Sequence, residues 1–146
     1  MNDKILSHTK WECKYHVVFI PKYRKKLLYG QLRSYVGDIL RMMARQKECE
    51  IEEGHLCEDH VHMLISIPPK YSVSQIVGYI KGKSAIYIAR NFTGYKMNFG
   101  GQKFWARGYY VSTAGRDEQM IREYIRNQEK EDKKEDYMQQ GSLFVK

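Results

Sequence analysis

Runs of β-branched and aromatic residues predict four β-strands in this chain. The first run is stopped by Pro21, which is a poor residue for a central strand. The second and third runs are separated only by Glu58 and Asp59, a spacing that fits a tight hairpin turn. The predicted strands are residues 15–20, 50–57, 60–67 and 104–112.

Outside the strands, apolar residues recur at three- and four-residue spacing, which is the pattern of helices with one buried face. The second helix is expected to begin after Ser72, whose hydroxyl would form a capping box with Gln75. The last helix has Asp117 and Glu118 at its start, where carboxylates favour the helix dipole. The predicted helices are residues 32–47, 73–88 and about 116–131, followed by an irregular tail at about 132–146.

The order of these elements is strand, helix, strand, strand, helix, strand and helix. Split βαβ units of this kind close into a ferredoxin-like (βαββαβ) α+β fold, an antiparallel four-stranded sheet with helices on one face. In that plan residues 60–67 form a central strand, and the last helix is an additional C-terminal element. With 146 residues and no change in composition along the chain, we expect one domain spanning residues 1–146.

The composition adds a charge bias to this picture. The chain has 25 Lys and Arg residues against 17 Asp and Glu, a net charge of +8, and 12 tyrosines. Cations hold phosphates and aromatic rings stack on bases, so this composition favours a nucleic-acid partner. A basic protein without such a partner is the alternative on charge alone.

A membrane protein and a secreted protein are not expected. No apolar run approaches the roughly 20 residues of a membrane span, and residues 1–11 contain no signal-like apolar segment. We therefore expect a cytoplasmic protein, associated with the nucleoid when it binds DNA. Three cysteines without framework spacing make structural disulfides unexpected.

Two histidines mark the third predicted strand as a candidate metal site. His60 and His62 are two residues apart, so in a strand both imidazoles point to the same face. A two-residue turn would pair Cys57 with His60 and His55 with His62, and paired residues share a face. A structural zinc site made of these four residues is therefore a rival interpretation. The simplest alternative is two histidines hydrogen-bonded within a sheet.

The last predicted helix carries Tyr124 and Gln128, which are four residues apart and share a helix face. A tyrosine phenol, with a reference pKa of about 10, becomes a usable nucleophile beside a metal-bound phosphate. An amide oxygen could join two imidazoles around Mg²⁺ or Mn²⁺, and imidazole ligands favour Mn²⁺. The alternative is that Tyr124 belongs to the apolar stripe of Ile121 and Ile125 and is a core residue.

Several cations are candidates for holding nucleic acid. Residues 22–26 contain four cations and a tyrosine at the end of the first predicted strand. A solvated loop is the alternative for such a run. The candidate DNA-binding residues are Lys22, Arg24, Lys25 and Lys26, and then Lys81, Lys83 and Arg107.

In combination these features resemble the IS200/IS605 family of single-tyrosine HUH transposases. The resemblance covers nearly the whole chain. Asp59-His60-Val61-His62 is similar to the HUH motif of that family, and residues 124–128 are similar to its catalytic helix. Residues 15–26 and 104–111 are similar to its first and fourth strands.

The resemblance implies a function that the spacing alone does not. A protein of this family acts on single-stranded DNA at the ends of an insertion element and recognises imperfect hairpins there. His60, His62 and Gln128 would bind the divalent metal, and Tyr124 would attack the scissile phosphate to leave a 5′-phosphotyrosine and a free 3′-hydroxyl. The family also implies a homodimer in which the tyrosine helix of one subunit completes the histidine site of the other.

Other functions remain open from the sequence. A domesticated relative would bind hairpin DNA or RNA without cutting it, and a transposase retained by its host would act on dispersed repeats. Binding alone would need none of the four candidate site residues, which are Tyr124, His60, His62 and Gln128. A structural zinc protein would unfold when the metal is chelated, whereas a transposase fold would survive metal removal.

Overall fold

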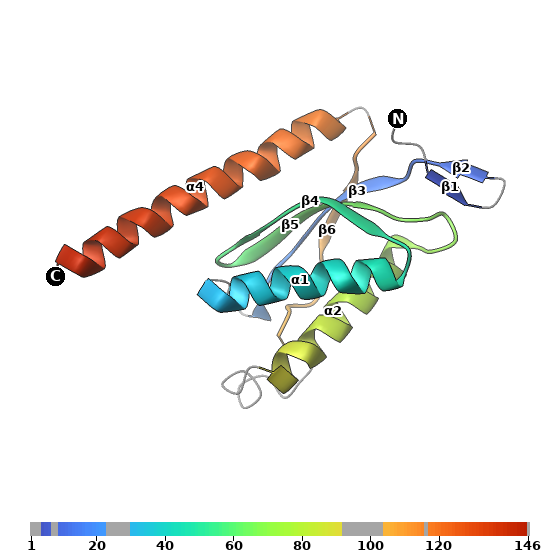
Figure 1. Cartoon of the computed structure of the whole chain (residues 1–146). Helices are drawn as coiled ribbons and strands as arrows, with labels where there is room; N and C mark the ends of the chain where they lie inside the picture. The colour runs from blue at the N-terminus through green and yellow to red at the C-terminus, as the bar shows by residue number, and fades with distance from the viewer. Residues whose placement is uncertain (1–3, 7–8, 23–29, 92–103, 116, 146) are drawn as a thin grey trace.

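The computed structural model describes the backbone of residues 4–6, 9–22, 30–91, 104–115 and 117–145, and the side chains of residues 10–22, 30–91, 104–115 and 117–131. Its centre is an antiparallel sheet with strand order β4-β5-β3-β6. The strands are β3 (Lys14–Phe19), β4 (Glu50–Cys57), β5 (His60–Ser66) and β6 (Tyr110–Thr113). Helices α1 (Gly30–Gln46) and α2 (Val73–Asn91) cover one face of the sheet, and α4 (Glu118–Val145) lies across the other (Figure 1).

The predicted ferredoxin-like plan is confirmed, with β5 in a central position. The tight hairpin between β4 and β5 is also confirmed, because Cys57 pairs with His60 and His55 pairs with His62. At the start of α2, the hydroxyl of Ser72 accepts a hydrogen bond from the backbone of Gln75 at 3.1 Å, and the Gln75 side chain accepts one from the Ser72 backbone at 2.8 Å. This reciprocal pair is the expected capping box.

The main hydrophobic core lies between the sheet and the helices α1 and α2. Strand residues Val17 and Ile65 are almost fully buried against helix residues such as Val36 and Ile80. At the edge of this core, the Trp105 ring packs edge-to-face against Phe19. Its Nε1 donates a hydrogen bond to the buried hydroxyl of Ser84 at 2.8 Å. The apolar stripes predicted from the sequence are therefore the ones that hold this layer together.

The fourth strand is shorter and later than predicted. The expectation was residues 104–112, but β6 is Tyr110–Thr113. Phe104 and Trp105 are both buried, so their side chains do not alternate between two faces as in a strand. Trp105 makes only an isolated bridge to Pro21, and Gly108 then takes a positive φ of 79° that breaks the extended chain.

At the chain ends, one element was not predicted and one prediction is wrong. Strands β1 (Lys4–Leu6) and β2 (Thr9–Trp11) form a separate hairpin that the polar sequence did not predict. Helix α4 continues to Val145, whereas an irregular tail was expected from residue 132. The dense Glu and Lys of this segment are good helix formers, which explains the continuation. No helix in the described part of the chain is both long enough and apolar enough to span a membrane.

Candidate active site

The face of the sheet that α4 covers carries both histidines of β5. Val61, Met63 and Ile65 point into the main core, so His60 and His62 point to the opposite side. His60 is partly exposed and donates a hydrogen bond from Nδ1 to Asp59 Oδ1 at 2.7 Å. That bond fixes the orientation of the His60 ring and leaves its Nε2 as the nitrogen that can bind a ligand.

A third histidine, His16 of β3, stands beside His62. The two rings are stacked with centroids 5.6 Å apart, and His16 Nε2 lies 3.3 Å from His62 Nδ1. Burial lowers the pKa of His16, which favours its neutral form. His16 was not among the predicted site residues, although its alternation with Tyr15 and Val17 in the first predicted strand was a usable signal.

Tyr124 of α4 lies over these rings within the same chain. Its ring centroid is 5.4 Å from that of His62 and 6.2 Å from that of His16, in both cases edge-to-face. The side chain is 48% exposed, so the prediction that Tyr124 could be a simple core residue is not supported. The neighbouring Ile125 is the buried anchor of this helix and packs with Leu64 and Ala114.

A surface cleft of about 470 Å³ opens beside Tyr124. His16, Tyr110 and Tyr124 form one part of its wall. Tyr110 is exposed, and its ring meets that of His16 edge-on at 5.9 Å. The cleft thus places an exposed phenol and an exposed aromatic ring next to the histidines.

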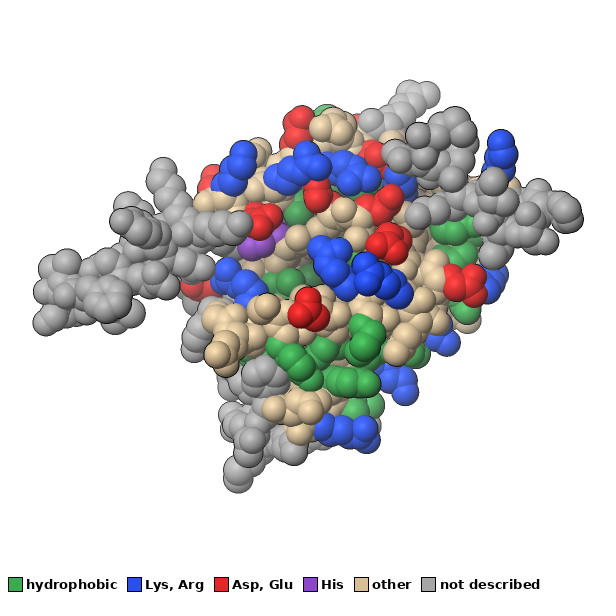
Figure 2. Space-filling view, viewed as in Figure 1, with side chains coloured by type: hydrophobic (Ala, Val, Ile, Leu, Met, Phe, Trp, Pro, Cys, Tyr) green, Lys and Arg blue, Asp and Glu red, His purple; other side chains and the backbone are tan. Residues whose placement is uncertain are grey.

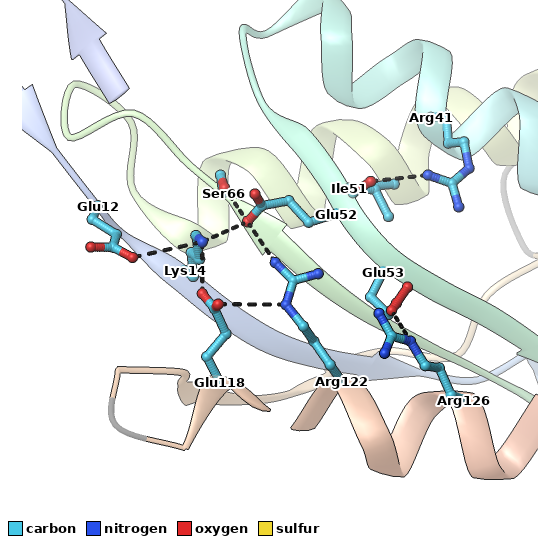
Figure 3. Close-up of polar contacts among 10 residues, drawn as sticks. All are labelled: Glu12, Lys14, Arg41, Ile51, Glu52, Glu53, Ser66, Glu118, Arg122 and Arg126. Atoms are coloured by element: carbon cyan, nitrogen blue, oxygen red, sulfur yellow. Dashed lines mark hydrogen bonds and ion pairs between the residues drawn. The ribbon is translucent and has the colours of Figure 1, made fainter. Parts of the chain in front are cut away.

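Ion pairs hold the first turns of α4 to the sheet (Figure 3). Lys14 of β3 lies 2.6 Å from Glu118 and 3.3 Å from Glu52, and Arg122 pairs with the same Glu118 at 3.5 Å. One turn later, Arg126 donates to Glu53 at 2.6 Å. The strand pairing shifts between Ile51 and Glu53, and this irregularity lets two consecutive glutamates reach α4.

These contacts change the ionisation of their members. Burial lowers the pKa of Lys14, but the hydrogen bonds and charges of Glu118 and Glu52 outweigh that effect, so the pKa is raised overall. The hydrogen bond from Lys14 lowers the pKa of Glu118, and it outweighs the opposing effect of burial. Both residues are therefore charged at neutral pH and fix the start of the helix that carries Tyr124.

Among the described residues, Cys57, His60 and His62 form a group that could hold a metal ion. One ligand atom from each lies within 4.8 Å of the others. His55, the fourth member of the predicted zinc site, is not part of this group. The donors suit a divalent cation, because two imidazoles already have Nδ1 engaged by Asp59 and His16. Gln128 is partly buried on α4, one helical turn beyond Tyr124.

Of the predicted DNA-binding cations that the structure describes, Lys81 and Lys83 lie on α2 rather than at this site. Arg24, Lys25 and Lys26 lie outside the described residues. Lys81 is committed to the fold, because its ammonium donates to the carbonyls of Ala106 and Gly108 at 2.7 and 2.8 Å. Burial lowers the pKa of Lys81.

The other three cations in that prediction differ in position. Lys83 lies on α2, on the far side of the sheet from the histidines, near the ring of Tyr79. Lys22 and the exposed Arg107 flank the Pro21–Trp105 bridge, just beyond the paired ends of β3 and β6. On the face shown in Figure 2, basic and acidic side chains are interspersed.

Comparison with known proteins identifies several similar chains. The family model described as "Transposase IS200 like" matches residues 9–128. The transposase for insertion sequence element IS200 of Salmonella typhimurium is 48% identical over 132 residues, which cover 90% of this chain and 87% of that protein. The ISDra2 transposase TnpA of Deinococcus radiodurans is 29% identical over 119 residues, which cover 81% of this chain and 85% of that protein.

Two solved structures have the same fold. One, from Deinococcus radiodurans R1 and described as a transposase, superposes with a TM-score of 0.70 at 29% identity, covering 86% of this chain and 97% of its own. The other is a REP-associated tyrosine transposase bound to a REP hairpin, with a TM-score of 0.55 at 17% identity, covering 86% of this chain and 70% of its own.

Proposed function

Because this chain belongs to the family of IS200-like transposases, we propose that it cleaves and rejoins single-stranded DNA at the ends of an insertion element. Tyr124 is the nucleophile in this proposal. The observation that carries it is the position of an exposed tyrosine beside His62, on a helix that is otherwise anchored by the buried Ile125. A tyrosine that served only packing would have its hydroxyl and ring enclosed.

The reaction we infer is a transesterification. The Tyr124 hydroxyl loses its proton and attacks the scissile phosphorus, while the bond from phosphorus to the 3′-oxygen breaks. The DNA 5′ end then remains on the enzyme as a phosphotyrosine, and the other end leaves as a free 3′-hydroxyl. That hydroxyl can later attack another such linkage, so strands are rejoined without an external energy source.

The residues we assign to a divalent metal are His60, His62 and Gln128. When bound, the metal supplies Lewis-acid polarisation of the phosphate. The chain supplies the orientation: Asp59 holds His60, and the neutral His16 can accept a hydrogen bond from Nδ1 of His62. Each histidine would then offer Nε2. The imidazoles favour Mn²⁺ over Mg²⁺, although both have the required charge.

The partner we infer is a single-stranded DNA that forms an imperfect hairpin. The solved relative bound to a REP hairpin supports a hairpin ligand. The cleft beside Tyr124 supports a flanking nucleotide there, because Tyr110 offers an exposed ring for stacking. Lys22, Arg107 and the cations of residues 24–26 are the remaining candidates for phosphate contacts.

A homodimer with shared active sites is part of this proposal. Tyr124 of one copy would then act at the histidines of a second copy, rather than at those of its own chain. Mixing Tyr124→Phe protein with a His60→Ala, His62→Ala double variant distinguishes the two arrangements. Recovery of cleavage in the mixture indicates shared sites, whereas an inactive mixture indicates that each chain uses its own tyrosine.

The direct test is incubation with a single-stranded oligonucleotide from the element's end, followed by a denaturing gel. We expect a covalent protein–DNA adduct with Mn²⁺, none with EDTA, and none with Tyr124→Phe. Tyr110→Phe is the matched control, because it removes a hydroxyl from the same cleft and should retain the adduct. Hairpin binding without any adduct would instead indicate a non-cleaving DNA-binding protein.

A further inference from the structure

The candidate metal centre contains a thiol that the proposed reaction does not use. Cys57 pairs with His60 across the β4–β5 hairpin, and its side chain is 3% exposed. Its Sγ and one ring nitrogen from each of His60 and His62 lie within 4.8 Å of one another. Mg²⁺ prefers oxygen ligands, so the thiol has no role when Mg²⁺ is bound.

A thiolate and two imidazoles are typical ligands for zinc. In a tetrahedral zinc site, Zn–S is about 2.3 Å and Zn–N about 2.0–2.1 Å, so the ligand atoms lie about 3.3–3.6 Å apart. The three atoms here are within 4.8 Å, so closure needs shifts of about an ångström, which side-chain rotations next to a hairpin turn can supply. Zn²⁺ also binds such ligands more tightly than Mn²⁺ does.

His60 and His62 are already oriented to bind a metal ion. Their Nδ1 atoms are engaged by Asp59 at 2.7 Å and by His16 at 3.3 Å, which is the outer-shell arrangement common around metal-binding histidines. Cys49 offers a contrast within the same chain. It is equally buried, but among the described residues it belongs to no group that could hold a metal ion, and burial and Glu48 raise its pKa to about 12.

We propose that Cys57, His60 and His62 form a zinc site that overlaps the catalytic centre and switches cleavage off. This inference rests on the proposed function for its effect on activity, but the zinc site itself does not. A four-coordinate ion with three protein ligands has one open position, whereas a six-coordinate ion held by three ligands keeps three for phosphate oxygens. A negative thiolate ligand also lowers the effective positive charge of the ion, so the ion attracts a phosphate less strongly.

The test of the site uses Co²⁺ as a spectroscopic substitute for Zn²⁺ in the full-length protein after treatment with EDTA. We expect an intense near-ultraviolet thiolate-to-cobalt band in the wild type and in Cys49→Ser. Cys57→Ser should lack the band, and Zn²⁺ should abolish it in the wild type at a stoichiometry of one per chain. Absence of the band in the wild type at saturating Co²⁺ would overturn the proposal, as would its retention in Cys57→Ser.

The effect of the zinc site on activity is tested by measuring the inhibition of cleavage by Zn²⁺ in the wild type and in Cys57→Ser. The rate of each protein is expressed relative to its own rate in Mn²⁺ alone. Removal of a direct ligand should raise the Zn²⁺ concentration for half inhibition by about 100-fold in Cys57→Ser, since even outer-shell losses cost about 10–100-fold. Equal inhibition of both proteins would contradict the switch. If Tyr124→Phe still forms an adduct, the proposed function fails while the cobalt result stands.

Discussion

The two faces of the sheet are closed in different ways. Towards α1 and α2, the strands bury a continuous apolar layer in which Val17, Ile65 and Ile80 are almost inaccessible. Towards α4, the buried apolar cluster among the described side chains is small, with Leu64, Ala114 and Ile125 at its centre, and it is accompanied by histidines, ion pairs and an exposed tyrosine. Successive residues of one strand therefore lie alternately in the apolar core and on the face with the candidate active site.

We expect the two faces to contribute differently to folding stability and to the proposed chemistry. Burial of apolar area is the main source of folding free energy, so the α1–α2 face should determine whether the chain folds. The α4 face is held by few apolar contacts and by charges, so α4 should open at a lower free-energy cost than global unfolding. The helix that carries the proposed nucleophile, Tyr124, should then be able to move without loss of the fold.

The largest effect on stability should come from the core face. Ile65→Ala should lower the free energy of unfolding by about 2–5 kcal/mol, because it removes a buried side chain from a closely packed layer. Ile125→Ala is the matched change on the other face and should cost at most about 2 kcal/mol, since α4 can detach locally. Urea denaturation measures both, and equal losses would remove the distinction between the faces.

The next effect concerns two adjacent residues of β3 that point to opposite faces, His16 and Val17. His16→Phe should weaken Mn²⁺ binding by about 10–100-fold, because it removes the partner of His62 Nδ1. His16→Gln should recover much of that affinity, since its carbonyl oxygen can accept the same bond. Val17→Ala should lower stability instead, with unchanged Mn²⁺ affinity by titration calorimetry.

A smaller effect should follow loss of the Lys14 cluster. Lys14→Met should cost about 1–3 kcal/mol, because Glu118 and Glu52 lose the nearer of the two cations that they share and keep only the more distant Arg122. The stability from Glu118, whose pKa is lowered, is present above its ordinary pKa of 4.5 and is lost as pH falls through its folded value. The contribution of Lys14, whose pKa is raised, is present below its ordinary pKa of 10.5 and is lost at higher pH.

Amide hydrogen exchange in α4 measures this dependence. Between those two pH values the helix should be best protected, and acidification below pH 4.5 should increase its exchange before that of α2. In Lys14→Met the acid-dependent part of this change should shrink. A response of α4 to acid that is identical in both proteins would show that this cluster does not hold the helix.

The smallest effect is expected at Arg126. Its ion pair with Glu53 is short at 2.6 Å, but more than half of the Arg126 side chain is exposed. Arg126→Ala should therefore change stability by less than about 1 kcal/mol, and salt should weaken the remaining contribution. A loss as large as that of Ile125→Ala would mean that charge, rather than the buried isoleucine, anchors α4.

Local patterns in the sequence predicted much of this arrangement. The Glu58–Asp59 turn set the pairing of Cys57 with His60, and the spacing of Tyr124 and Gln128 placed both on one helix face. These features depend on neighbours within one or two elements. The family resemblance then supplied the chemistry that such local patterns do not specify.

The unpredicted features depend on contacts between distant segments. His16 contacts His62 because the strand register places β3 beside β5. Lys14 helps to hold α4 because it contacts Glu118, which is distant in the sequence. The segment after residue 131 was predicted to be irregular, yet the helix propensity of its Glu and Lys residues favours the observed helix. At Trp105, which lies within the predicted strand of residues 104–112, packing in the core overrode strand propensity.

We propose that the α4 face performs the chemistry through Tyr124. Mass spectrometry of the protease-digested adduct formed with Mn²⁺ and a cognate single-stranded oligonucleotide tests it most directly. We predict that the peptide containing Tyr124 carries a 5′-phosphonucleotide and that the DNA product ends in a 3′-hydroxyl. A nucleotide on any other residue, or cleavage that leaves no protein-linked nucleotide, would contradict the account.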